Sequence, residues 1–190
     1  MTRCYSRPHA APRARLVTSH APRIRSLSEI RRLRDPRAQA SALLAGPDPY
    51  VDDGPGFVYS HARVLTSIWN DFQQNRIFRR TLLAKVEIKA GHTNNLERRL
   101  GEYAVCTPEY TFLWDCAYST TRRMLLERLV HLALRQLGAK LKRYRCHGCG
   151  KRHREYYDFV RAGGFAGVER IIRYWLGKMG ETAFVRYEFL

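Results

Sequence analysis

The segment Lys89–Leu100 constrains the fold of this chain more than any other part of its sequence. It predicts the end of a strand, a glycine turn at Gly91 and then a capped helix. Thr93 or Asn94 is expected to be the N-cap, because both side chains accept hydrogen bonds from the first helical amides. With Asn94 in that role, Glu97 occupies N3 and forms a variant of the capping box.

This predicted helix has one apolar and one basic face. Leu96, Leu100 and Tyr103 recur at helical spacing and are expected to face the core. Arg98 and Arg99 project from the first turns, next to the positive end of the helix dipole. Such a helix start with adjacent arginines can bind a phosphate group. The alternative interpretation is an ordinary strand-turn-helix with a solvated basic face.

The same segment resembles the second half of the GIY-YIG nuclease motif, in which a strand end is followed by Thr, Asn and then Arg. Three further segments match that superfamily in the same order: Gly56–Tyr59 at the first motif, Glu127–His131 on the helix of the metal-binding glutamate, and Cys146–Tyr157 at the close. The last segment resembles the bacteriophage T-five ORF DNA-binding domain branch, found in fungal proteins related to a meiotically up-regulated gene product. The resemblance covers roughly residues 54 to 160.

The resemblance implies roles for three catalytic residues. Glu127 would bind a catalytic Mg²⁺ or Mn²⁺, and Arg99 would hold the scissile phosphate. Tyr59 would orient or deprotonate the attacking water, which requires the pKa of its phenol to fall toward neutrality. His92 or His131 could take that role instead.

The nucleic acid itself is expected to contact four residues at the helix start: Lys89, Thr93, Arg98 and Arg99. Thr93 would also cap the helix and fix its loop. Each assignment has a structural alternative: Glu127 could form a surface ion pair with Arg123 one turn earlier, and Tyr59 or His131 could belong to the core.

Two departures from the superfamily pattern keep a second function open. Lys89 replaces the second tyrosine of the motif, and the interval between Tyr59 and Lys89 is far longer than the usual ten or so residues. A helix carrying Ile68 and Trp69 must therefore be inserted between two adjacent strands. If the insertion displaces Tyr59, the protein is a non-catalytic module that binds DNA or RNA.

The charge balance favours nucleic acid as the partner, and DNA first. Lys and Arg outnumber Asp and Glu by 34 to 17, which gives a net charge of +17 over 190 residues. No apolar run approaches the roughly 20 residues that cross a bilayer, so no membrane partner is expected. The sequence gives no indication of a small-molecule cofactor. A mitochondrial or ribosome-associated RNA-binding protein is the third interpretation.

The N-terminal part is expected to be a basic, disordered arm covering residues 1–45, with the folded domain at residues 46–190. The arm holds ten arginines, no lysine and no acidic residue before Glu29. The sequence also allows a short helix from Ser28 to about Leu44. Five cysteines and no secretory segment favour an intracellular protein, with the nucleus first and a mitochondrial transit peptide as the alternative.

Hydrophobic patterning in the rest of the chain predicts an α+β domain, a small antiparallel β-sheet flanked by α-helices. The expected strands are Gly56–Ser60, Thr81–Ile88, Tyr110–Tyr118 and Glu155–Val160. The expected helices run through Val64–Phe72, from Thr120 or Thr121 to Leu137, and through Phe165–Met179. Gly138 is expected at the C′ position of the middle helix, and the last helix is expected only to pack on the core.

A structural Zn²⁺ site is predicted in the loop at about residues 140–155. Cys146, Cys149 and His153 have the spacing of a zinc knuckle with a third ligand attached. Cys106 is the first choice for the fourth ligand, with His131 or His147 as the second. The alternative is a free cysteine pair in a basic loop.

Overall fold

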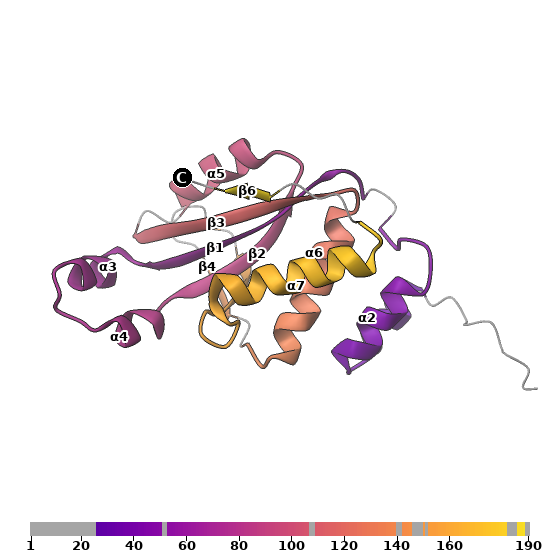
Figure 1. Cartoon of the computed structure of the whole chain (residues 1–190), viewed down its shortest axis with the longest axis horizontal. Helices are drawn as coiled ribbons and strands as arrows, with labels where there is room; N and C mark the ends of the chain where they lie inside the picture. The colour runs from indigo at the N-terminus through magenta and orange to yellow at the C-terminus, as the bar shows by residue number, and fades with distance from the viewer. Residues whose placement is uncertain are drawn as a thin grey trace, which may run out of the picture.

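A computed structural model describes residues 26–50, 53–106, 109–139, 142–145, 150, 152–181 and 186–188. The first 25 residues of the predicted disordered arm, and Cys146 and Cys149 of the predicted zinc site, lie outside these ranges. The described chain forms one antiparallel sheet covered by helices (Figure 1). The predicted α+β class is confirmed.

The sheet has six strands in the order β4-β5-β2-β1-β3-β6. Their bounds are β1 Gly56–Leu65, β2 Glu87–Thr93, β3 Tyr110–Thr120, β4 Lys142–Arg145, β5 Arg152–Asp158 and β6 Arg186–Glu188. The helices are α1 Leu27–Arg32, α2 Pro36–Leu44, α3 Thr66–Gln73, α4 Arg79–Leu83, α5 Leu96–Cys106, α6 Arg123–Gln136 and α7 Gly164–Lys178. Adjacent strands are antiparallel throughout.

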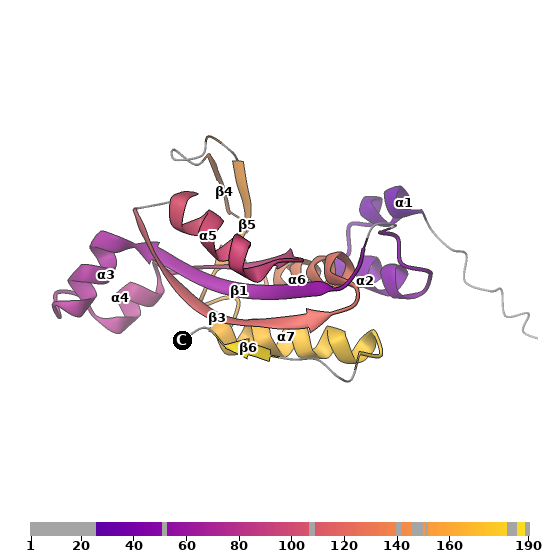
Figure 2. The ribbon, with the colours of Figure 1, turned by 90° about the horizontal axis from the view of Figure 1, so that it is seen from above.

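The central strand β1 pairs with β2 on one side and β3 on the other, and is buried along most of its length. Figure 2 shows α5 on one face of the sheet and α7 on the other. Because side chains alternate along a strand, Val58 packs toward the core beneath α6 and α7, while Tyr59 packs with Tyr103 of α5. The two faces of β1 therefore belong to two different buried clusters, a large one beneath α6 and α7 and a smaller one beneath α5.

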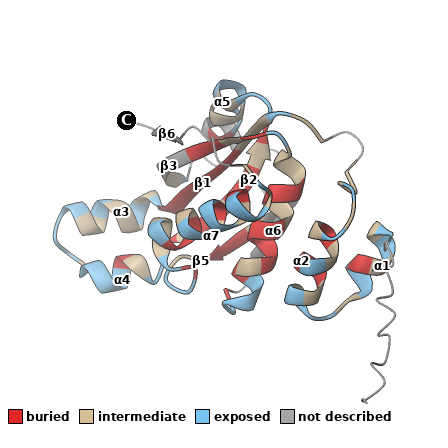
Figure 3. Cartoon of the chain, turned by 45° about the vertical axis from the view of Figure 1, so that its right-hand side comes forward, coloured by how far each residue is buried: buried red, intermediate tan, exposed pale blue. Residues whose placement is uncertain are grey.

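Helices α1 and α2 precede the boundary that the sequence suggested at Gly46. Ile30 and Leu43 are buried in a cluster with Leu125 and Leu129 of α6. Figure 3 shows buried residues along the facing sides of these helices. The packed part of the chain thus begins near Leu27, and the expected short helix is present as two pieces.

The insertion between β1 and β2 consists of α3 and α4, at one end of the sheet (Figure 1). The predicted strand Thr81–Ile88 is wrong in its first half, because α4 covers Arg79–Leu83 and β2 begins at Glu87. Leu82 and Val86 bury against Val64. The insertion has its own small core and leaves the pairing of β1 with β2 intact.

Helix α6 has the predicted C-terminus but a different N-terminus. Gly138 follows it with φ of 67°, as a C′ glycine does. Neither Thr120 nor Thr121 caps its first amides. Instead, the Asp53 carboxylate accepts hydrogen bonds from the backbone N–H groups of Met124 (2.9 Å) and Leu125 (3.0 Å). No helix in the described part of the chain has the length and apolarity that crossing a bilayer requires.

Candidate functional site

The two halves of the GIY-YIG-like motif lie opposite each other in the sheet. Tyr59 on β1 pairs with Gly91 on β2, and His61 pairs with Lys89. The long insertion therefore leaves Tyr59 in register with the glycine turn. A Cβ atom at Gly91 would lie 2.5 Å from the Tyr59 hydroxyl oxygen, so glycine is required by close approach.

Tyr59 is buried, with 2% of its surface exposed, and its hydroxyl lies 3.1 Å from the hydroxyl of Tyr103. Burial raises the pKa of Tyr59 to about 12, although the Tyr103 hydrogen bond and the Arg99 charge oppose the shift. The nearby Glu127 carboxylate adds to it. This direction is opposite to the fall in pKa that a phenolic base requires.

Helix α5 begins one residue later than the sequence suggested. The Asn95 Oδ1 atom accepts a hydrogen bond from the Arg98 backbone N–H at 2.9 Å, which makes Asn95 the N-cap. The Thr93 hydroxyl accepts one from the Asn95 backbone N–H at 3.1 Å. Thr93 is itself buried, so its role in this structure is to fix the loop that opens the helix.

Both arginines of α5 lie against one carboxylate. Glu102 is 2.7 Å from Arg99 Nη1 and 3.7 Å from Arg98 Nε. The Arg99 Nε atom is buried and has no hydrogen-bond partner in the described part of the chain. Arg98 is mostly exposed. The pair can receive an anion, in competition with Glu102.

Glu127 of α6 joins two histidines. Its Oε2 atom lies 2.7 Å from His92 Nδ1 on β2, and its Oε1 atom lies 3.7 Å from His131 Nε2 one helical turn later. Burial alone would raise its pKa, but the two histidines hold the pKa of Glu127 at about 2. The alternative ion pair with Arg123 is not formed, since Arg123 donates to the carbonyl oxygen of Gly54.

The two ring nitrogens of His131 face different surroundings, a tyrosine hydroxyl on one side and two carboxylates on the other. Its Nδ1 atom lies 2.6 Å from the Tyr157 hydroxyl. Its buried Nε2 atom has no hydrogen-bond partner among the described residues and faces Glu127 and Glu155, the latter at 3.9 Å. In the tautomer protonated at Nδ1, the Nε2 lone pair is directed between two carboxylates.

Glu127, His131 and Glu155 each offer a ligand atom, and these atoms lie within 4.8 Å of one another. Two carboxylate oxygens and an imidazole nitrogen form a donor set that suits a divalent cation. Glu155 has φ of 73° within β5, the left-handed region that non-glycine residues seldom adopt. The residue with this unfavourable backbone conformation is thus also one that contributes a carboxylate to the cluster, and such strain is often found at functional sites.

Lys89 lies beside the same cluster. Its Nζ atom is 3.9 Å from Glu155 Oε2, and its side chain is largely buried. Burial lowers the pKa of Lys89, opposed by the charges of Glu155 and Glu127. The Lys89 side chain is largely buried beside the Glu155 carboxylate. Lys89 can therefore contact an incoming anion only if its ammonium group moves toward that anion.

The structure thus brings together Tyr59, Lys89, Arg99 and Glu127, and with them His92, one of the two histidines that the sequence offered as an alternative to Tyr59. His153 lies on β5. Cys146, Cys149 and the side chain of Cys106 fall outside the described part of the chain. The zinc site therefore stays a prediction from the sequence.

Three residues of the site are not predicted from the sequence to be part of it. Tyr103 was expected only in the core, although it reaches the Tyr59 hydroxyl. The sequence places Glu155 and Tyr157 in a strand and in the closing segment of the resemblance, and gives neither of them a role in the site. Their alternation along β5 would not have revealed them, because the left-handed backbone at Glu155 breaks the alternation.

Residues 85–177 match the family model described as "Meiotically up-regulated gene 113", which is grouped with the GIY-YIG-like domains. The matched segment runs from just before β2 to the last turn of α7, and includes Lys89, Arg99, Glu127 and Glu155. No curated protein and no solved structure matches the chain. This segment is therefore similar to a family of GIY-YIG-like, nucleic-acid-related domains.

Proposed function

We propose that this protein binds DNA and cleaves its phosphodiester bonds in a reaction that depends on a divalent metal. The observation that carries the proposal is the group of ligand atoms from Glu127, His131 and Glu155 within 4.8 Å. It is centred on the glutamate that the resemblance assigns to the metal. The basic charge of the chain supports a polyanionic substrate.

The donor set fits such a cation on two grounds. His131 Nε2 is buried and lies 3.7 Å from Glu127 Oε1 and 3.9 Å from Glu155 Oε2, longer than a normal hydrogen bond, and a cation between these three atoms would bind all of them directly. The Tyr157 hydroxyl next to Nδ1 can fix the ring and its tautomer. A mixed oxygen and nitrogen site favours Mn²⁺ over Mg²⁺. When bound, the cation would stabilise negative charge on the phosphate.

The remaining residues would bind and orient the substrate. Arg99 would hold a non-bridging phosphate oxygen, and Arg98 and Lys89 would contact neighbouring charge. His92 would accept a proton from the attacking water, because its Nδ1 atom is held by Glu127 and its ring is partly exposed. Tyr59 and its partner Tyr103 would orient the phosphate or the water as hydrogen-bond donors, which their raised pKa values favour.

One observation favours the second candidate function, a non-catalytic nucleic-acid-binding module. Tyr59 is buried and its pKa is raised to about 12, so it is a poor base. In that case Glu127 serves to hold His92 and His131 in place, and the basic surface alone provides the function.

The deciding experiment is cleavage of supercoiled plasmid with Mn²⁺ or Mg²⁺, together with DNA binding by fluorescence anisotropy. We expect the wild type to nick the plasmid and Glu127→Gln to lose roughly 100-fold or more in rate. DNA affinity should stay within about threefold, because Glu127 contacts metal rather than phosphate backbone.

The matched control is Glu169→Gln on α7, which removes the same charge from a glutamate paired with Arg173. It should cleave like the wild type. Salt-dependent binding without nicking by any variant would support the binding-only module. Absence of both activities would reject both functions.

We also propose a structural Zn²⁺ held by Cys146, Cys149, His153 and Cys106, and a nuclear location. The zinc proposal rests on ligand spacing, and metal analysis of purified protein should give one zinc per chain. A fluorescent reporter fused to residues 1–45 tests the location, with mitochondrial import as the contrary result.

A further inference from the structure

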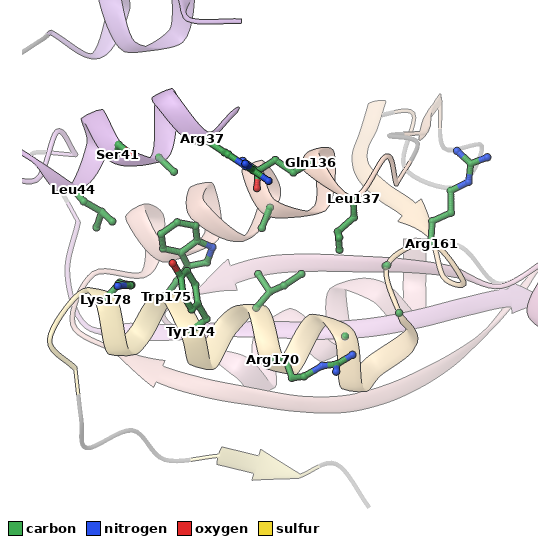
Figure 4. A pocket seen from close by; sticks show the side chains of 16 residues that line it. Arg37, Ser41, Leu44, Gln136, Leu137, Arg161, Arg170, Tyr174, Trp175 and Lys178 are labelled. Atoms are coloured by element: carbon green, nitrogen blue, oxygen red, sulfur yellow. The ribbon is translucent and has the colours of Figure 1, made fainter. Parts of the chain in front are cut away.

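A groove lies between α2, α6 and α7, outside the candidate cleavage site (Figure 4). Its volume is about 970 Å³. It is lined by Arg37, Ala40, Ser41, Leu44, Ala133, Gln136, Leu137, Arg161, Ala162, Gly163, Gly167, Arg170, Ile171, Tyr174, Trp175 and Lys178. On α6, Gln136 follows Glu127 by nine positions, which is about half a rotation around the helix. The groove and the candidate site therefore use opposite sides of α6.

The inside of the groove is apolar. Leu44 of α2 and Ile171 and Trp175 of α7 are only partly covered by the rest of the described chain. Leu137 is 54% exposed and Tyr174 is 55% exposed, and both rank among the exposed large hydrophobic residues. Exposed apolar side chains gathered around one concavity are a feature of interaction sites.

The edge of the groove is positively charged. Arg37, Arg161, Arg170 and Lys178 line it, and no lining residue carries a carboxylate. None of the four forms an ion pair with another side chain in the described ranges. Arg161 is instead held by the Gly138 carbonyl oxygen at 3.2 Å. The groove is thus complementary to an acidic partner.

Trp175 gives a second, independent indication of a ligand. Its Nε1 atom is buried and has no hydrogen-bond partner in the described part of the chain, and its ring packs edge-on against Tyr174. A buried indole N–H usually finds an acceptor. A carboxylate or carbonyl oxygen entering the groove would supply one after a small rotation of the ring.

We propose that this groove binds an acidic amphipathic helix of a partner protein. The apolar face of such a helix would cover Leu44, Leu137 and Ile171, and its carboxylates would meet the four cations. A nucleic-acid strand could satisfy the cations but has no aliphatic side chains to fill the apolar interior. The open trough between helices also matches the helix-in-groove mode of recognition.

The test uses the full chain and one synthetic probe, a fluorescent 18-residue peptide. The peptide carries Leu at i, i+3, i+4 and i+7 positions and Glu on the opposite face. Its control has the same composition in scrambled order, so it keeps the charge but has no apolar face. We expect the ordered peptide to bind at least about tenfold more tightly by anisotropy, with a change in Trp fluorescence that Trp175→Phe abolishes.

Two variants locate the binding. Ser41→Trp, at an exposed position of α2, should fill the groove and weaken binding by about tenfold or more. Arg37→Glu combined with Arg170→Glu should do the same by reversing the charge at its edge. Arg76→Glu, on the α3–α4 insertion, is the matched control and should bind as the wild type does.

Equal binding of the ordered and scrambled peptides, or full binding by a folded Ser41→Trp variant, would overturn the proposal. Competition by duplex DNA that disappears in the Arg37→Glu, Arg170→Glu variant would also overturn it, in favour of a nucleic-acid surface. None of these outcomes depends on whether the protein cleaves DNA.

Discussion

Gly91 and Tyr59 face each other across the β1–β2 pair so closely that a Cβ atom on Gly91 would lie 2.5 Å from the Tyr59 hydroxyl oxygen. Gly91→Ala should therefore displace the Tyr59 ring and lower the free energy of unfolding by about 1–3 kcal/mol. Urea denaturation measures this change. Gly101→Ala is the control and should not destabilise the fold, because no atom of the described residues lies within 4 Å of its added methyl group and alanine is favoured over glycine within a helix.

The steric origin of the Gly91 effect has its own check. In a Tyr59→Ala background the added methyl group has room, so Gly91→Ala should cost much less there than in the wild type. Additive costs would show that the glycine is needed for another reason.

Glu102 should oppose anion binding, because it lies against both Arg98 and Arg99. Glu102→Gln frees the two guanidinium groups and removes a negative charge from the proposed DNA surface. We expect DNA affinity to rise by about three- to tenfold at low salt, with the gain shrinking as salt screens the charges. Glu169→Gln on α7 should leave affinity unchanged, and a gain of equal size there would indicate a general charge effect.

Glu155 should lower the stability of the fold through its backbone conformation while its carboxylate contributes to metal binding. Glu155→Gly relieves the backbone at φ of 73°, which costs a non-glycine residue about 1 kcal/mol. It should unfold at the same or higher urea concentration than Glu155→Gln, which keeps the strain. Both variants should lose Mn²⁺ binding in calorimetric titration, and retention of it would remove Glu155 from the metal site.

Tyr59 should destabilise the fold in alkaline solution. Its phenol has a pKa of about 12 in the folded chain and near 10 when unfolded, so the unfolded chain binds fewer protons between these values. The free energy of unfolding must therefore fall as pH rises from about 10 to about 12. In Tyr59→Phe the free energy of unfolding should fall less over this range. Urea denaturation at pH 8, 10 and 11 measures the difference. Tyr174→Phe, at an exposed position, should behave as the wild type does.

Asp53 should be needed for the first turn of α6. Asp53→Ala leaves the Met124 and Leu125 amides without their acceptor, at a cost of about 1 kcal/mol. Hydrogen exchange at those two amides should accelerate more than exchange in the rest of α6. Asp71→Ala on α3 serves as the control, because within the described part of the chain its carboxylate contacts only the exposed Arg76.

Much of the fold could be predicted because its signals are local. The aromatic alternation at Tyr110–Tyr118 became β3, and the apolar stripe at Phe165–Met179 became α7. Gly138 ended α6 as its position suggested. The strand at Thr81–Ile88 was misplaced because α4 is a short helix of the insertion, stabilised by burial of Leu82 rather than by a periodic pattern.

The candidate site was only partly predictable, because several of its contacts join distant segments. The resemblance identified Glu127 and Arg99, and the structure places them near Tyr59. Nothing local indicated that His92 would reach Glu127, or that β5 would bring Glu155 to His131. The N-cap at Asn95 differs from the expected Thr93 or Asn94 because Thr93 is used within the preceding turn.

The central position of β1 determines which pieces of this chain can be produced as independent folding units. The family match begins at residue 85 and so excludes β1, α2 and Asp53. A fragment cut at that boundary would leave β2 and β3 without the strand that separates them, and would expose Leu125 and Leu129 where α1 and α2 now pack. Fragments for expression or for transplanting the domain should therefore start no later than Leu27, well before the segment that matches the family model.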